Sequence, residues 1–194
     1  SRLGEVYEDR LGQLDDAIRT FRRIFDELEP SSEVAMLALE RIYGQKQQWV
    51  ELREVLERQL QHAQGDSHEA EIRAKVAFLL SERLGEVDKA VETWQRVLDL
   101  RGEDPEALFA LADLHERTEH WAELAEVLER HYAITDNDED RVAVLLRRAR
   151  LFDKQLGRED QALDDYARVL EVDYGNVDAL YATAPEAAAA DRLA

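Results

Sequence analysis

The chain repeats one short pattern three times at nearly constant spacing. Leu-Gly occurs at Leu11-Gly12, Leu84-Gly85 and Leu156-Gly157. An alanine, an aromatic residue and an aliphatic residue follow each glycine at the i, i+4, i+7 spacing of one buried helix stripe. These residues are Ala17, Phe21 and Ile24, then Ala90, Trp94 and Val97, then Ala162, Tyr166 and Val169. The repetition predicts an array of helical units.

A second pattern lies between these stripes. Trp49, Leu52, Val55 and Leu56 match, position by position, Trp121, Leu124, Val127 and Leu128. The interval between the two sets equals the one from Gly85 to Gly157, and we call it the repeat interval. The larger unit therefore holds up to two helix pairs. We expect a single array over residues 1–194, with approximate units at 1–66, 67–135 and 136–194.

The apolar periodicity predicts long helices joined by short turns. We place them at 1–11, 14–28, 31–44, 48–63, 67–84, 87–100, 104–118, 120–134, 138–156, 159–172 and from 176 onward. Gly12, Gly85 and Gly157 are predicted to end helices in a left-handed conformation. Asp104-Pro105 reads as an N-cap followed by proline at the first helical position. Sequential helices with such short connections should pack antiparallel.

The glycine, the small residue five positions later and the aromatic residue four beyond it resemble the second half of a tetratricopeptide repeat. The segments between them, which lack the glycine, fit the same pattern more loosely. The resemblance covers nearly all of residues 1–182. It implies an all-α fold, a right-handed α-solenoid of antiparallel helix hairpins, and a protein-binding scaffold as the function.

Composition limits the chemistry that the chain can perform. The net charge of −19 repels phosphate backbones, which disfavours nucleic acid as a partner. Cysteine is absent, and no apolar run approaches the roughly 20 residues that span a bilayer. We find no nucleophile motif, phosphate loop or zinc spacing. The sequence therefore predicts no catalytic residue, metal or cofactor, and a protein that is not an enzyme.

The resemblance also implies where a partner would bind. In such arrays the first helix of each hairpin lines the concave face, and its inward-pointing residues are those outside the buried stripe. Carried over to this chain, the predicted binding residues are Arg41, Lys75, Leu79, Arg83, Phe109, Arg117, Arg147, Leu151 and Lys154. Their basic character in an acidic chain favours a peptide or protein partner with acidic and bulky apolar side chains.

Three other interpretations remain open at this stage. The basic residues could simply pair with Glu82, Glu116 and neighbouring acids, since surface ion pairs are common and weak. The array could be a structural spacer or a self-assembling element that associates through its repeat ends. It could also be the regulatory or substrate-docking arm of a larger enzyme.

The termini and the residue usage give weaker indications. The chain opens without a methionine, and its first helix is shorter than the run ending at Leu84, so we expect a fragment of a longer array. Pro185 falls where the pattern expects a helix interior, so the last helix either stops early or forms an atypical cap. Arginine outnumbers lysine 21 to 4, which hints at a bacterial source. A cytoplasmic location is the default, and a fragment does not determine it.

Overall fold

A computed structural model describes residues 2–184, with side chains from residue 12 onward. The described residues form helices and turns, in two compact units, Ser1–Gly102 (unit 1) and Glu103–Ala194 (unit 2). This division follows compactness along the chain. It does not test the three repeat boundaries read from the sequence, which stay a prediction.

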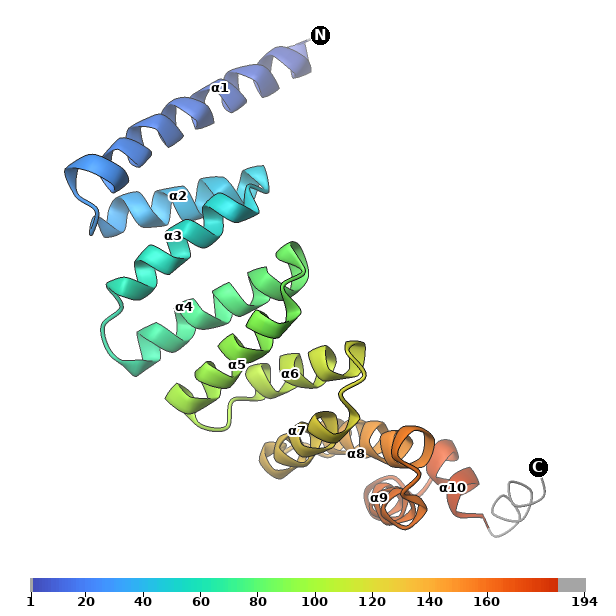
Figure 1. The fold of residues 1–194 in the computed structure, drawn as a ribbon. Helices are drawn as coiled ribbons and strands as arrows, with labels where there is room; N and C mark the ends of the chain where they lie inside the picture. Colours follow the sequence, from blue (N-terminus) through green and yellow to red (C-terminus); the bar gives the residue numbers. More distant parts are fainter. Residues whose placement is uncertain (1, 185–194) are drawn as a thin grey trace. The chain divides into compact units, whose positions relative to one another are not determined.

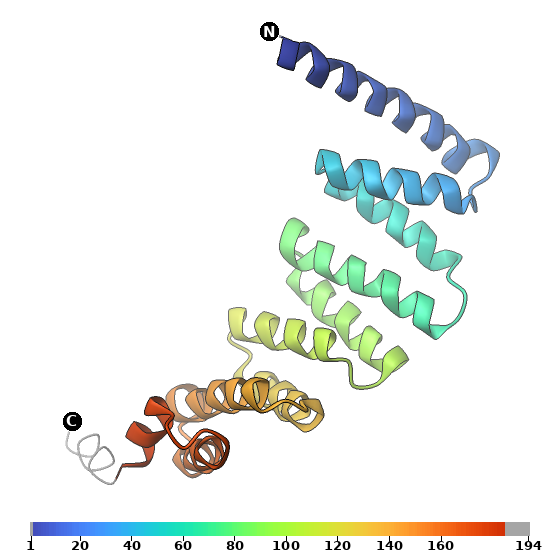
Figure 2. The same cartoon turned by 180° about the vertical axis from the view of Figure 1, so that it is seen from behind.

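Unit 1 contains five α-helices and two short π-helical turns. Their bounds are α1 Arg2–Arg23, η1 Ile24–Leu28, α2 Glu33–Lys46, α3 Trp49–Gln61, α4 Asp66–Leu79, η2 Leu80–Leu84 and α5 Val87–Arg101. Helices α2 and α3 form one antiparallel hairpin, and α4 and α5 form the next (Figures 1 and 2).

Unit 2 repeats this arrangement. Its elements are α6 Pro105–Arg117, α7 Trp121–Ile134, α8 Asp138–Leu151, η3 Phe152–Leu156, α9 Glu159–Val172 and α10 Val177–Thr183. The hairpins are α6 with α7 and α8 with α9, and α10 packs on α9 (Figure 1). The predicted all-α fold of antiparallel helix hairpins is confirmed. Pro185 and Ala187–Ala190 lie outside the described residues.

The predicted apolar stripes supply the cores of both units. Trp94 in unit 1 and Tyr166 in unit 2 are buried, each between an alanine one turn earlier and a valine one turn later that are also buried. The first stripe is less complete, because Phe21 and Ile24 are only half-buried and Phe25 takes the central place against Leu39. Burial of these aromatic and aliphatic side chains stabilises the packing of the hairpins.

Two of the three predicted glycine turns are present. Gly85 (φ 68°) and Gly157 (φ 60°) take the left-handed conformation, and each follows a π-helical turn. Glu86 N–H donates to the Leu80 carbonyl at 2.9 Å, and Arg158 N–H donates to the Phe152 carbonyl at 2.8 Å. The two turns, one repeat interval apart, therefore close in the same way.

The prediction for Gly12 is wrong, because α1 runs through this residue without a break. One continuous helix keeps the backbone hydrogen bonds that a turn would interrupt, at a cost of about 1 kcal/mol for the internal glycine.

The looser hairpins turn without glycine. Gln47 (φ 56°) and Glu119 (φ 59°) occupy the left-handed region where glycine is usual. Each is followed by a residue whose N–H donates five positions back, from Gln48 to Tyr43 and from His120 to His115, both at 2.9 Å. The hydrogen bonding of a helix C-cap is thus retained even where the glycine is missing.

Aspartate or asparagine caps three of the helices of unit 2. The side chain of Asp104 accepts a hydrogen bond from Ala107 N–H, with Pro105 at the first helical position, which confirms the predicted cap. The side chains of Asn137 and Asn176 accept in the same way from Asp140 and Ala179. These caps fix where α6, α8 and α10 start.

Candidate functional site

The predicted binding residues all lie on the first helices of the hairpins or on the π-helical turns that end them. Arg41 is on α2, Lys75 and Leu79 are on α4, and Arg83 is in η2. In unit 2, Phe109 and Arg117 are on α6, Arg147 and Leu151 are on α8, and Lys154 is in η3. We call the surface formed by these helices in each unit its first-helix face.

Most of the predicted cations on this face pair with carboxylates of the same unit. Lys75 Nζ lies 2.9 Å from Glu40, and Arg147 pairs with Glu116. Arg117 lies 3.6 Å from Asp113, and Lys154 lies 2.9 Å from Asp153. The Arg83 guanidinium instead lies 5.1 Å from the centre of the Trp49 ring. The alternative in which these cations mainly balance nearby acids is therefore supported for four of them.

Two of the predicted apolar contact residues are placed in the core. Leu79 and Leu151 are 3% and 4% exposed, so they hold helices together and offer no surface to a partner. Both belong to the buried stripe of their helix, because first helices in this chain bury more positions than the pattern assigned to them. Phe109 is 60% exposed, and it is the apolar residue of the predicted set that a partner can reach.

Phe109 and Arg147 border one cavity in unit 2, which we call the Phe109 pocket. Its volume is about 490 Å³, within the range of small-ligand sites and large enough for one or two side chains. Helices α6, α7 and α8 and the turn between α7 and α8 form its walls. The lining residues are Pro105, Phe109, Leu128, His131, Ile134, Thr135, Asp136, Asn137, Asp140, Ala143, Val144 and Arg147.

The pocket has an apolar floor and a charged rim. Leu128 and Val144 are buried at its base, whereas Arg147 and Asp140 stand at its edge. The pKa of His131 is lowered by burial and by the nearby Arg147 guanidinium, with Asp140 acting in the opposite direction. Sequence reasoning missed His131. It lies one repeat interval after Gln59, and this polar match within an apolar stripe is the sequence signal that could have found it.

Comparison with known proteins identifies the repeat. Two profiles described as tetratricopeptide repeat match residues 35–70 and 107–142, and residues 2–30 and 143–173. Together they cover about two thirds of the chain. The chain belongs to the tetratricopeptide repeat family. No curated protein matches it.

Solved tetratricopeptide repeat structures share the fold at low identity. A crystal structure of MamA has a TM-score of 0.59 at 16% identity, covering 87% of this chain and 93% of that one. YrrB, described as a TPR protein with an unusual peptide-binding site, has a TM-score of 0.57 at 16% identity, covering 90% and 85%. A tetratricopeptide repeat protein from Parabacteroides merdae has a TM-score of 0.61 at 16% identity, covering 76% and 56%. These similarities establish the fold.

Family membership supports a scaffold for protein–protein interaction as the general role. Proteins of this family are generally non-enzymatic scaffolds. Among the described side chains, residues 12–184, no group of three His, Cys, Asp or Glu residues is arranged to hold a metal ion. None of the helices within the described part of the chain combines the length and the apolarity needed to cross a bilayer.

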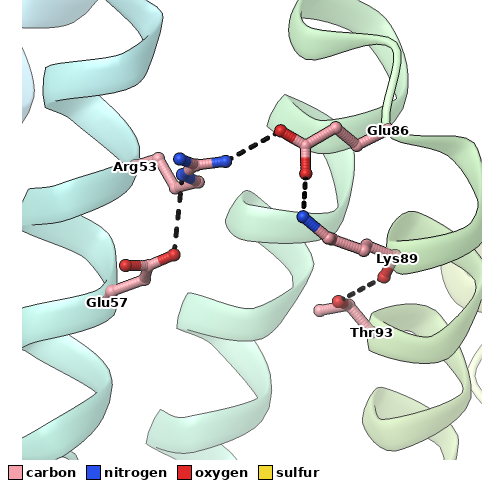
Figure 3. A network of polar contacts seen from close by, with 5 residues as sticks. All are labelled: Arg53, Glu57, Glu86, Lys89 and Thr93. Carbon is pink, nitrogen blue, oxygen red and sulfur yellow. Dashed lines mark hydrogen bonds and ion pairs between the residues drawn. The ribbon is translucent and has the colours of Figure 1, made fainter.

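A second cavity, of about 400 Å³, lies in unit 1 between α3, α4 and α5. Its base is formed by Leu60, Val76 and Leu80, and its rim by charged residues. Figure 3 shows part of that rim: the guanidinium of Arg53 donates to Glu86 at 2.8 Å and lies 3.6 Å from Glu57, and Lys89 lies 2.5 Å from Glu86. The cations of this rim are thus already balanced, and no predicted binding residue borders the cavity.

Proposed function

We propose that the chain binds a protein or peptide partner on its first-helix face, with the Phe109 pocket as the main anchor point. The observation that carries the proposal is the exposed Phe109 ring beside a cavity with an apolar base. Such a cavity can desolvate one bulky side chain of a partner, and binding energy in protein interfaces is concentrated in contacts of this kind. The basic residue Arg147 at the rim favours a partner that presents an acidic group locally.

We propose a smaller set of contact residues for this role than the sequence predicted. Phe109 and Arg147 share one pocket, while Arg41, Lys75 and Arg83 lie in unit 1. Leu79 and Leu151 leave the set as contact residues because they are buried. Arg117 and Lys154 stay in it as proposed contributors of positive charge.

A capture experiment with matched phenylalanine variants tests the proposal. The chain is used as bait in a lysate with Phe109→Ala and Phe78→Ala as the variants. Phe78 is a control of similar exposure, 55%, in unit 1 and outside both cavities. A partner that is lost with Phe109→Ala and retained with Phe78→Ala, and that then binds the purified chain, supports the proposal. A partner retained by both variants places binding elsewhere.

A second candidate function, self-association through a repeat end, has one observation in its favour. Tyr174, Val177 and Tyr181, on and just before α10, are 88%, 77% and 75% exposed. Large apolar side chains clustered in this way often mark an interface. Sedimentation velocity over a range of concentrations tests the idea: assembly requires a species that grows with concentration and disappears in Val177→Glu. The role as an arm of a larger enzyme stays an expectation from the sequence.

A further inference from the structure

In unit 1 a carboxylate bridges Gln59 and Lys75, the counterparts of two residues that line the Phe109 pocket, His131 and Arg147. Glu40 on α2 accepts a hydrogen bond from Gln59 Nε2 on α3 at 2.7 Å. It also accepts one from Lys75 Nζ on α4 at 2.9 Å. Gln59 is buried, so the amide that it presents to Glu40 is shielded from water. One carboxylate therefore joins three helices at this point.

Unit 2 keeps the donors and lacks the acceptor. One repeat interval later, His131 stands in the place of Gln59 and Arg147 in the place of Lys75, and both line the Phe109 pocket. The residue in the place of Glu40 is Ala112, which is fully buried and has no group that can reach them. Arg147 pairs instead with Glu116, one turn further along α6.

We propose that the Phe109 pocket binds the side chain of a glutamate or aspartate from a partner peptide, in the place that Glu40 fills in unit 1. The carboxylate lies between Arg147 and His131, and an adjoining apolar residue of the peptide packs on Phe109 and the pocket base. This assignment rests on the proposed function and names the chemistry of the partner at that site.

The ion pair of Arg147 with Glu116 does not close the site. The Glu116 side chain is 50% exposed and that of Arg147 is 25% exposed, and an ion pair with one partner in solvent is weakened by water and salt. A partner carboxylate that enters the cavity meets Arg147 in a less hydrated environment, where charge-assisted hydrogen bonds are stronger. Guanidinium can also donate to two acceptors at once, so Glu116 need not be displaced completely.

The opposite edge of the pocket limits how acidic the partner can be. Asp136 and Asp140 line that edge, and Asp140 is bonded to Asn137 at the start of α8. They repel a second carboxylate placed beside the first. The site therefore selects a single acidic residue with an apolar neighbour over a run of acidic residues.

Binding of a carboxylate should take up a proton at His131. The titratable groups facing this ring are Arg147 and Asp140 of α8 and Asp136 of the preceding turn, while α6 contributes the uncharged Pro105 and Phe109. A carboxylate beside the ring favours its protonated form and raises its pKa in the complex. Affinity should therefore increase as the pH falls from 8 to 6. His131→Gln, which restores the residue of unit 1, should bind with no such increase.

The test uses two blocked pentapeptides, Gly-Leu-Glu-Leu-Gly and Gly-Leu-Gln-Leu-Gly, titrated into the isotopically labelled chain and followed by NMR. We expect the glutamate peptide to shift the signals of Phe109, His131 and Arg147, and to bind about tenfold more tightly than the glutamine peptide. Ala112→Glu supplies the missing carboxylate from within and should abolish the difference. Equal binding of the two peptides, or no shift with either, would overturn the assignment.

A second variant keeps the test decisive if Ala112→Glu does not fold. Arg147→Gln keeps the pocket and removes the cation. Its affinity for the glutamate peptide should therefore fall to its affinity for the glutamine peptide. An undiminished preference for glutamate in Arg147→Gln would also overturn the assignment. The proposed function has its own test, since a partner captured through Phe109 would stand even if neither peptide bound.

Discussion

Units 1 and 2 share one backbone pattern, but different side chains lie between their helices. In unit 2, Arg148 of α8 is 3% exposed and donates two hydrogen bonds to Asp165, which is 2% exposed, at 2.6 and 2.7 Å. Its guanidinium also pairs with Glu129 and lies 5.5 Å from the centre of the Tyr132 ring. In unit 1 the residues at the places of Arg148 and Asp165 are Val76 and Thr93.

The consequence in unit 1 is the cavity whose rim Figure 3 shows. Val76 is too short to reach the position of the Arg148 guanidinium, and the charges move to the rim as the ion pairs of Arg53 and Lys89. The helix hairpin thus tolerates either a buried charge cluster or an apolar base beneath surface ion pairs. The shared stripe of small and aromatic residues sets the backbone, and the variable positions decide whether a cavity is left.

The largest expected effect comes from breaking the buried pair on one side only. Asp165→Ala leaves the guanidinium of Arg148 buried without its main acceptor, which should lower the free energy of unfolding by about 3–5 kcal/mol. Urea denaturation followed by circular dichroism measures this. The double variant Arg148→Val with Asp165→Thr installs the residues of unit 1 and should lose no more than about 2 kcal/mol. A double variant as unstable as the single one would show that the pair itself is not the cause.

The next largest effect on the free energy of unfolding is expected at the helix ends. One end has glycine in the left-handed conformation and the other has glutamate. Gly157→Ala should lower the free energy of unfolding by about 1–2 kcal/mol because its φ of 60° is unfavourable for a residue with a Cβ. No atom lies within 4 Å of the added Cβ, so the loss would come from the backbone alone. Glu119→Gly, at the turn that lacks glycine, should stabilise the chain by about 0.5–1 kcal/mol. Changes of the same sign at both positions would contradict this explanation.

The hairpins and their buried stripes follow from spacing in the sequence, because a helix must bury one face and the repeat shows which face it is. Gly85 and Gly157 were also predictable, since their conformation is local. Gly12 was not, because an internal glycine costs a helix only about 1 kcal/mol and does not by itself decide whether the helix breaks. The three π-helical turns leave no pattern of their own in the sequence.

The candidate site was predictable only in part. The sequence placed Phe109 and Arg147 on the same face, but it could not show that they border one cavity, since that depends on how α6, α7 and α8 pack together. Leu79 and Leu151 were assigned to the surface because a periodic pattern does not fix the width of the buried stripe. The partners of Lys75 and Arg147 come from neighbouring helices, which only packing reveals.

A smaller loss of stability, with a gain of peptide binding, is expected in unit 1 when its carboxylate is removed. Glu40→Ala removes the acceptor of Gln59 and Lys75, which should lower the free energy of unfolding by about 1 kcal/mol. It should also open a second place for a carboxylate, so that Gly-Leu-Glu-Leu-Gly shifts the signals of Gln59 and Lys75. Glu51→Ala, which removes a carboxylate from the first turn of α3, serves as the control. No new shifts in unit 1 would mean that Ala112 alone does not explain the pocket.

The smallest expected effect is on the pH dependence of stability. It arises at His115, whose counterpart one repeat interval earlier is Tyr43. Burial lowers the pKa of His115 below its ordinary value of 6.5, with Glu123 opposing and His120 adding to the shift. Its Nδ1 finds no hydrogen-bond partner among the described residues. The unfolded chain therefore binds more protons than the folded one below about pH 6.5, so stability should fall as the pH drops through that range. His115→Tyr should show a shallower fall between pH 7 and 5.5, and the exposed His62→Tyr serves as the matched control. Parallel slopes for the unmodified chain and His115→Tyr would mean that the folded ring takes up a proton as readily as the unfolded one, and that the two units do not differ in their response to pH at this position.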